Sequence, residues 1–462
     1  LGHESLIMQQ SEITSISDAI KDCLRCGKCK PVCSTHVPRA NLLYSPRNKI
    51  LATSLLIEAF LYEEQTRRGI SLQHWDDFSD VADHCTVCHR CETPCPVDID
   101  FGDVSMAMRD LLRRMGKQRF NPGKAASMFF LNTTHPETIK FTRKVMIDWG
   151  YKAQRLGHRA LHVLGEAQAK RPPATTGGRP PVREQVVHFV NKKMPGGLPK
   201  RTARALLDIE DRNYVPVIRD PARTSSDSEA VFYFPGCGSE RMHADVSRAA
   251  LYVLLKAGVQ VVLPPPFLCC GFPHQANARD KQQGRQVLQD TIIFSQVREM
   301  LRYLDFQAVV VTCGTCMDGL RHMGAEGIFG APLVDAGRFA LDAGLAVPGP
   351  IEPVLYHRPC HDSMEEAGMR VLADRAGVAP TAVPHCCSEA GTLSLSRPDI
   401  TGDMLDRKAR AIREALAGHA PGTPILTHCP ACLTGLGRNA RLGAVPRHVT
   451  VHLATRAGGP GW

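Results

Sequence analysis

All eighteen cysteines of this 462-residue chain fall into two repeated patterns of close spacing. In the first pattern, four cysteines follow one another as C-x2-C-x2-C-x3-C. The second pattern is a single cysteine, then two adjacent cysteines, then a C-x2-C pair. The first pattern is formed by Cys23, Cys26, Cys29 and Cys33, and again by Cys85, Cys88, Cys91 and Cys95. The second is formed by Cys237, Cys269, Cys270, Cys313 and Cys316, and again by Cys360, Cys386, Cys387, Cys429 and Cys432. Thiolates at such spacings converge on iron, which predicts a protein that moves electrons.

The first pattern is that of bacterial ferredoxins. There, three cysteines of one run bind one [4Fe–4S] cube and the fourth cysteine binds the other cube. This rule predicts a cubane cluster on Cys23, Cys26, Cys29 and Cys95 and a second cubane on Cys85, Cys88, Cys91 and Cys33. Pro96 follows the second run as the signature expects, whereas Ser34 follows the first. Two structural zinc sites are the alternative, and they usually have a longer gap between two C-x2-C halves.

The five-cysteine sets exceed the four thiolates that zinc or a simple cube uses. Both cysteines of an adjacent pair reach one cofactor only in a sharp turn or around a larger group. Gly271 permits such a turn after the first pair, whereas Ser388 stands at the equivalent place after the second. Buried free cysteines or a disulfide between adjacent residues are the alternatives.

Extracellular disulfides would be the other use of so many cysteines. That use belongs mostly to short chains with little core, so reduced thiols and a cytoplasmic location are expected here. The sequence contains no uninterrupted apolar run of 18 residues. It opens on Leu1 and a polar segment, which suits a chain cut from a longer fusion.

The pattern of apolar residues divides the chain into a helical first half and an alternating second half. Helical spacing runs through 48–65 and 104–170, whereas 171–228 is rich in breakers and reads as a linker with a single helix over 201–209. Beyond residue 229, β runs alternate with helical stretches, which predicts α/β structure with a mainly parallel sheet. The expected strands are 230–234, 259–263, 308–312, 353–356 and 424–426, and the expected helices are 246–256, 281–304, 365–373 and 403–417.

The two five-cysteine sets repeat at a separation of about 120 residues, which predicts two copies of one unit. The expected fold class is therefore α plus α/β: an all-α, ferredoxin-like domain with two clusters, followed by two repeated α/β domains. The predicted parts are 1–120 (the helical two-cluster domain), 121–228 (a basic helical region and linker), 229–345 (the first repeat) and 346–462 (the second repeat).

Positive charge is concentrated in one segment. Residues 109–204 contain 21 Lys and Arg against 5 Asp and Glu, although the whole chain carries a net charge of only +10. A solvated basic face, an acidic partner and an anionic membrane surface all fit this charge. Nucleic acid is not expected, because neither a binding motif nor interleaved aromatic residues accompany the charge.

The motifs around the cysteines resemble those of a known family, the cysteine-rich "CCG" iron–sulfur proteins. The matching elements are PGC ending at Cys237, CCGFPHQ (269–275), CGTC (313–316), HRPCH (357–361), HCCSEAG (385–391) and CPAC (429–432). The order of two ferredoxin runs and two CCG domains is similar to that of the iron–sulfur subunits of glycolate oxidase and of heterodisulfide reductase.

This resemblance implies one or two further, noncubane [4Fe–4S] clusters on the five-cysteine sets, beside the two cubanes. It implies an oxidoreductase component that takes electrons from FAD on a partner subunit or an upstream domain, which oxidises glycolate or D-lactate, and passes them to a quinone-type acceptor. A disulfide-reducing subunit like that of heterodisulfide reductase is the alternative, and a zinc-stabilised scaffold is a third reading. Peripheral contact with the inner face of the cytoplasmic membrane would suit a quinone acceptor.

Several histidines accompany the cysteines, and three stand out. His274, His361 and His385 are the candidates for coupling a proton to electron transfer. No catalytic residue is assigned beyond these candidates, because the chain has no dinucleotide-binding G-x-G-x-x-G, no P-loop and no G-x-S-x-G motif.

Overall fold

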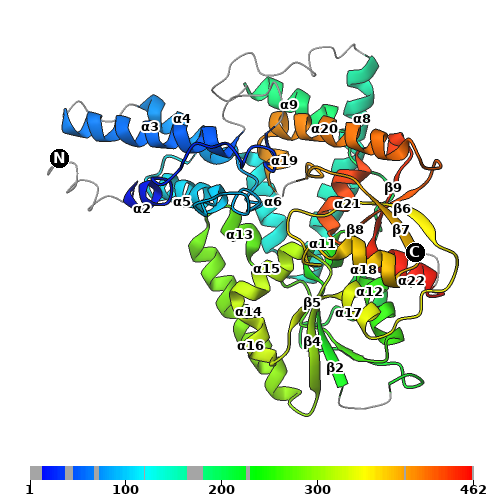
Figure 1. The fold of residues 1–462 in the computed structure, drawn as a ribbon. Helices are drawn as coiled ribbons and strands as arrows, with labels where there is room; N and C mark the ends of the chain where they lie inside the picture. Colours follow the sequence, from blue (N-terminus) through cyan, green and yellow to red (C-terminus); the bar gives the residue numbers. More distant parts are fainter. Residues whose placement is uncertain are drawn as a thin grey trace.

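The computed structural model describes residues 13–36, 45–66, 72–118, 120–163, 181–224, 229–389 and 392–459. Within these ranges, a helical N-terminal part is followed by two α/β parts, each built on its own sheet (Figure 1). The expected fold class, α followed by α/β, is confirmed.

The N-terminal part holds both four-cysteine runs in loops between helices. Its helices are α2 (Ile13–Asp18), α3 (Pro46–Gln65), α4 (Leu72–Asp83) and α5 (Phe101–Arg114). Their shared core includes Phe60, which stacks on Trp75 with ring centroids 4.7 Å apart, and the fully buried Phe78. The spacer between the runs is therefore helical as predicted, with the unexpected α4 beside the expected α3.

The two sheets share one strand order. The first contains β1 (Val217–Ile218), β2 (Glu229–Phe234), β3 (Gln260–Val262), β4 (Asp305–Val311) and β5 (Leu333–Asp335), in the order β1-β3-β2-β4-β5. The second contains β6 (Glu352–Tyr356), β7 (Val378–Ala382), β8 (Pro424–Thr427) and β9 (Val445–His448), in the order β7-β6-β8-β9. All of these pairings are parallel except that of β1 with β3. Apart from β1, each strand of one sheet thus has a counterpart in the other, as expected of a repeat.

Helices connect and cover the strands of both repeats. Those of the first are α11 (Gly236–Arg241), α12 (Ala244–Lys256), α13 (Phe272–Ala276), α14 (Asp280–Met300), α15 (Gly314–Met323), α16 (Ala325–Phe329) and α17 (Ala336–Asp342). Those of the second are α18 (Gly368–Arg375), α19 (Leu393–Ser396), α20 (Pro398–Leu416), α21 (Pro430–Gly437), the short η4 (Ala440–Leu442) and α22 (Val449–Arg456).

The basic segment is helical where helices are predicted, within 104–170, and beyond residue 170 it is more ordered than predicted. It contains α6 (Pro122–Asn132), α7 (Pro136–Arg143), η2 (Lys144–Trp149), α8 (Gly150–Val163), α9 (Val182–Asn191) and α10 (Ala203–Leu207). The prediction of a linker with only one helix over 171–228 is wrong for the described residues. There, α9 packs on α8 and α20, and β1 extends the first sheet, so tertiary contacts outweigh the local breakers. Most of the Pro- and Gly-rich run 171–181 lies outside the described residues.

The repeats are not independently packed. Val246, Ala249 and Val253 of α12, in the first repeat, belong to the same buried cluster as Val354 and Leu426 of the second. In Figure 1, α12 accordingly lies beside α22 at the C-terminal end of the chain. The predicted domain boundary between residues 345 and 346 therefore stays a prediction. This buried cluster contains residues from both sides of that boundary.

The two repeats approach each other closely at Gly314. A Cβ atom there would lie 2.0 Å from the carbonyl oxygen of His361 and 2.9 Å from the amide nitrogen of Asp362, both in the second repeat. We expect Gly314→Ala to lower the free energy of unfolding by about 1–3 kcal/mol, because two backbones must separate. Anaerobic urea unfolding measures the change.

The matched control is Gly284→Ala on α14, where an added Cβ meets nothing within 4 Å. That variant should gain about 0.5–1 kcal/mol, as alanine does over glycine inside a helix. Equal stabilities for the two variants would contradict the close approach at Gly314.

Candidate metal centres

The cysteines of the two repeats lie where parallel strands end. Cys237 and Cys313 follow β2 and β4 of the first sheet, and Cys360 and Cys429 follow β6 and β8 of the second. The carboxyl ends of neighbouring parallel strands share one edge of a sheet, which is where open α/β sheets collect ligands. The sheet topology therefore brings together residues that are far apart in the sequence.

A left-handed turn follows each adjacent pair of cysteines. Gly271 has φ 79° and Ser388 has φ 71°, so serine adopts the conformation that glycine provides in the first repeat. The Ser388 hydroxyl donates to the carbonyl oxygen of Cys387 at 2.5 Å. The turn that the sequence left in doubt is thus present in both repeats.

The thiols of both sets form one continuous series of contacts that reaches the helical part. Side-chain contacts join, in order, Cys237, Cys269, Cys270, Cys316, Cys313, Cys429, Cys432, Cys387, Cys386, Cys360 and Cys88. The first five belong to the first repeat, the next five to the second, and the last to the second ferredoxin run. None of the chain's eighteen cysteines is in a disulfide. Each predicted five-cysteine set is therefore gathered in one place, and the two sets adjoin through Cys313 and Cys429.

Crowding changes the acidity of these thiols. The Cys360 thiol and burial raise the pKa of Cys88 well above its usual range, and Cys386 and burial do the same for Cys360. Donation from Cys269 and Cys316 instead lowers the pKa of Cys270 to about 6. So many adjoining thiolates would repel one another in a buried site without positive charge. Iron ions supply that charge and deprotonate coordinating thiols, so the donor set fits iron–sulfur clusters.

In the helical part, four cysteines surround a small cavity. Its lining includes Cys33, Cys85, Cys88 and Cys91, the four thiols that the ferredoxin rule assigns to one cubane. Of the other predicted set, Cys23, Cys29 and Cys95 pack against one hydrophobic core, and Cys26 is exposed. The ligand assignments stay proposals, and the cavity fits the second of them.

Two arginines hold the helical part on the second repeat. The buried guanidinium of Arg397, the N-cap residue of α20, binds Asp80 of α4 at 2.5 Å and Asp399 at 2.9 Å. From within α20, the half-buried Arg407 donates to the carbonyl oxygens of Ser34 and His36, both at 2.5 Å. The Ser34 hydroxyl lies 3.5 Å from Cys88 Sγ and 3.9 Å from Cys360 Sγ, so the junction passes directly between the two kinds of cysteine set.

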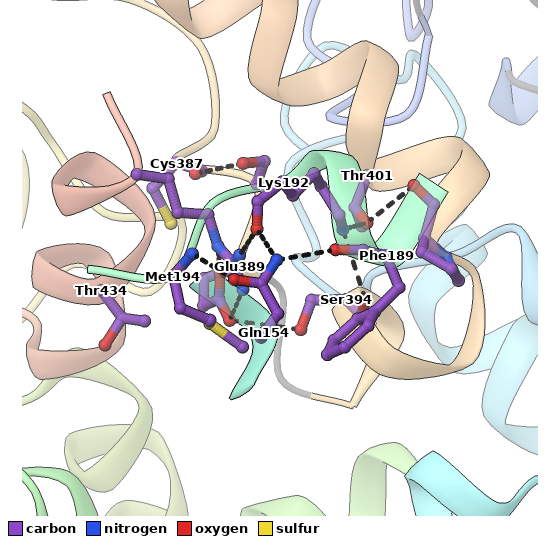
Figure 2. A network of polar contacts seen from close by, with 12 residues as sticks. Gln154, Phe189, Lys192, Met194, Cys387, Glu389, Ser394, Thr401 and Thr434 are labelled. Atoms are coloured by element: carbon purple, nitrogen blue, oxygen red, sulfur yellow. Dashed lines mark hydrogen bonds and ion pairs between the residues drawn. The ribbon is translucent and has the colours of Figure 1, made fainter. Parts of the chain in front are cut away.

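The basic helices are joined to the second set by a polar network (Figure 2). Arg438 Nε donates to Glu389, two residues after Cys387, at 2.7 Å, and its Nη1 donates to the Lys192 carbonyl at 2.7 Å. Burial alone would raise the pKa of Glu389, but the Arg438 guanidinium holds it below its usual value. Burial and Arg438 lower the pKa of Lys192 to about 7. Gln154 of α8 completes the network by donating to the Lys192 carbonyl at 2.8 Å.

The three predicted proton-coupling histidines lie in different surroundings. His361 bridges Asp318 of the first repeat, at 2.5 Å from Nδ1, and the Val87 carbonyl of the second ferredoxin run, at 3.2 Å from Nε2. His274 is buried on α13. Its pKa is lowered mainly by burial and, to a smaller extent, by the positive charge of Arg279. His385 is the most exposed of the three, and its pKa is also lowered, by the part of its ring that is shielded from water and by Arg407. Proton coupling stays a prediction for all three, and the contacts of His361 already give it a bridging role.

One functional candidate was not singled out from the sequence. A ring nitrogen of His357 and the sulfurs of Cys387 and Cys432 all lie within 4.8 Å of one another, and all three residues are buried. Nδ1 of His357 lies 2.9 Å from Nζ of Lys408, a fully buried lysine of α20. The position of His357 in the HRPCH motif was visible in the sequence, whereas the approach of Lys408 was not.

Two families match the chain. The "4Fe-4S dicluster domain" matches residues 14–99, and the "Cysteine-rich domain" (CCG) matches twice, over 231–321 and 354–437. No solved structure matches the chain. The chain thus contains one domain of the first kind and two of the second.

Curated relatives match the chain at low identity. The probable glycolate oxidase iron–sulfur subunit of Bacillus subtilis (strain 168) is 24% identical, over 94% of this chain and 92% of that protein. The glycolate oxidase iron–sulfur subunit of Escherichia coli (strain K12) is 21% identical, over 87% of this chain and 88% of that protein. Lactate utilization protein A of Geobacillus kaustophilus is 26% identical, over 48% of this chain and 96% of that protein.

Substitutions at Ser388 test whether the second repeat requires the left-handed turn. We expect Ser388→Gly to keep its iron and to stay within about 1 kcal/mol of the wild type, because relief of the left-handed conformation offsets the lost hydroxyl bond. Ser388→Val should lose about 2 kcal/mol or more, since a β-branched residue tolerates this φ poorly. Anaerobic unfolding and iron analysis measure both, and wild-type stability and iron in Ser388→Val would refute the required turn.

Proposed function

We propose that this chain, which is homologous to glycolate oxidase iron–sulfur subunits over 94% of its length, relays electrons for a flavin-dependent 2-hydroxyacid dehydrogenase. The electron donor would be FAD on a partner subunit or domain that oxidises glycolate or D-lactate. The acceptor would be a quinone. The cofactors of the chain would be two cubane clusters on the ferredoxin runs and one or two noncubane clusters on the five-cysteine sets.

The observation that supports a relay most directly is the unbroken series of thiol contacts from Cys88 to Cys237. When bound, iron–sulfur clusters take up and release single electrons, which suits a two-electron flavin donor. The chain's own residues would keep these centres close together, because Cys88 meets Cys360 and Cys313 meets Cys429. The packed sheet edges and α20 would keep water away from them.

Disulfide reduction, as in heterodisulfide reductases, is less well supported. Such a substrate must reach the five-cysteine sets, yet Cys269, Cys270 and Cys316 are only 5%, 3% and 4% exposed. Electrons can tunnel to buried centres, whereas a disulfide must contact them. The burial of these thiols therefore favours the relay.

Contact with an anionic membrane surface is the second part of the proposal. Residues 136–163 form one unbroken helix through α7, η2 and α8. Its exposed face alternates apolar and basic side chains. That face consists of Lys140, Phe141, Lys144, Val145, Trp149, Lys152, Leu156, Arg159 and Val163. Protein interfaces are depleted in lysine, whereas helices lying on anionic lipid combine lysine and arginine with tryptophan and phenylalanine. Peripheral contact through this face is what we propose. Within the described residues, no helix is long and apolar enough to cross a bilayer.

The relay is tested with the purified chain and a flavin-containing glycolate or D-lactate dehydrogenase. We expect the 2-hydroxy acid to bleach the iron–sulfur absorbance only when both proteins are present, because the chain has no recognised flavin-binding motif. Disulfide reduction by the isolated chain, with no response to the flavin protein, would contradict the relay. Two zinc ions and no iron in anaerobically purified protein would support the scaffold instead.

The membrane face is tested by sedimentation with vesicles of phosphatidylglycerol and phosphatidylcholine. Trp149→Ser should weaken binding severalfold, because an exposed aromatic anchor is lost, and 0.5 M salt should weaken binding further. The control is Leu288→Ser on α14, which also removes an exposed apolar side chain and should bind like the wild type. Equal binding of the wild type to pure phosphatidylcholine vesicles would rule out anionic recognition.

A further inference from the structure

The two five-cysteine sets differ in the residue that precedes their first cysteine by three positions. In the first repeat this residue is Phe234, the last residue of β2, and in the second it is His357, directly after β6. Both side chains are buried, at 1% exposure each. One set therefore has an apolar ring where the other has an imidazole.

His357 lies against the sulfurs of its own set. A ring nitrogen of His357 lies within 4.8 Å of both Cys387 Sγ and Cys432 Sγ. Nδ1 is occupied by Lys408, at 2.9 Å, whereas Nε2 is buried and has no hydrogen-bond partner among the described residues. Nε2 is thus the nitrogen left to face the thiols.

Lys408 decides which nitrogen carries the proton. Its Nζ donates to three backbone carbonyl oxygens, those of Val383 and Pro384 at 2.9 Å and that of His385 at 3.1 Å. The ammonium group has three hydrogens for four acceptors, these three carbonyls and Nδ1 of His357, so two of the acceptors share one hydrogen. Because the ammonium has no lone pair to accept an N–H, the nitrogen that faces it, Nδ1, is the unprotonated one and Nε2 bears the hydrogen. The Val383 carbonyl also lies near the ring and has a second lone pair, but a hydrogen on Nδ1 would face the Lys408 ammonium group 2.9 Å away.

We propose that His357 donates a hydrogen bond from Nε2 to a sulfur of the cluster held by the second set, and that this bond raises the cluster's reduction potential. Hydrogen bonds to cluster sulfurs stabilise the more negative, reduced state. Lys408 acts as a positioning residue that holds the imidazole in the donating tautomer. The inference rests on the proposed function only in requiring that the second set binds a cluster.

This arrangement makes the two adjoining sets unequal. Phe234 offers no donor to the first set, so this hydrogen bond acts on the second set alone. The second set also lies next to the helical part, through the contact of Cys360 with Cys88. An electron that leaves the ferredoxin runs would therefore meet the set with the added donor first.

The test is potentiometric titration of the intact, iron-loaded chain, followed by EPR, with His357→Phe and His357→Gln. The signal of the second set is identified by its loss in Cys387→Ala. In His357→Phe, the reduction equilibrium of that cluster should become about tenfold less favourable. Its midpoint potential should therefore fall by about 59 mV, the one-electron equivalent of a tenfold change. His357→Gln keeps an N–H donor and should restore at least half of the shift.

The matched control is His452→Phe on α22. His452 is equally buried, but its charged neighbours are Glu352, Arg447 and Arg456, not thiols. This variant should leave every potential unchanged. A shift of the same size in His452→Phe would mean that any buried substitution moves the potential, and it would overturn the proposal.

Two further outcomes would also overturn it. An unshifted signal in iron-loaded His357→Phe would show that no such bond tunes the cluster. Loss of the second-set iron in both His357 variants, with folding intact by circular dichroism, would make His357 a ligand. Either result leaves the relay standing, whereas failure of the proposed function would show as wild-type protein that lacks iron or is not reduced by a flavin partner.

Discussion

Eleven thiols lie in continuous contact inside this protein. As thiolates they would repel one another, and little solvent is present there to screen that repulsion. Thiolates can stay together there only if positive charge lies among them, and iron provides that charge. The rest of the structure serves this gathering of sulfur. Parallel strands deliver one cysteine or C-x2-C pair each, and left-handed turns at Gly271 and Ser388 direct the adjacent pairs toward the same place.

The contact between the helical part and the repeats depends on two arginines. Arg397, the N-cap residue of α20, is buried and Arg407 within α20 is half-buried, and removing such charges from water costs free energy that their partners must offset. Arg397 binds the Asp80 carboxylate of the helical part and Arg407 binds two of its backbone carbonyls, and this specifies one way of docking. That docking places Cys88 against Cys360, so the geometry of the electron path is a consequence of where these charges find partners.

The two repeats show how one architecture can hold two different sites. Their strand orders correspond, and their C-x2-C pairs begin α15 and α21 in the same way, with Cys313 and Cys429 as extended capping residues. They differ in the residues that lie beside the cysteines. The first repeat has the apolar Phe234 at the position where the second has His357, which contacts Lys408. Duplication therefore preserves the ligand geometry while the neighbouring residues are free to change.

The sequence by itself determined which residues are candidate ligands and the class of fold, because cysteine spacing and apolar periodicity are local properties of the chain. The C-x2-C pairs, the repeat and the strands before Cys237 and Cys313 could all be read in this way. The helix α9 of the linker region could not be predicted in this way, because its contacts with α8 and α20 stabilise it more than its own composition does. Only the tertiary structure decided that Cys88 faces Cys360, that Gly314 meets His361, and that Lys408 reaches His357. These contacts join residues 47 to 272 positions apart, and no local pattern encodes them.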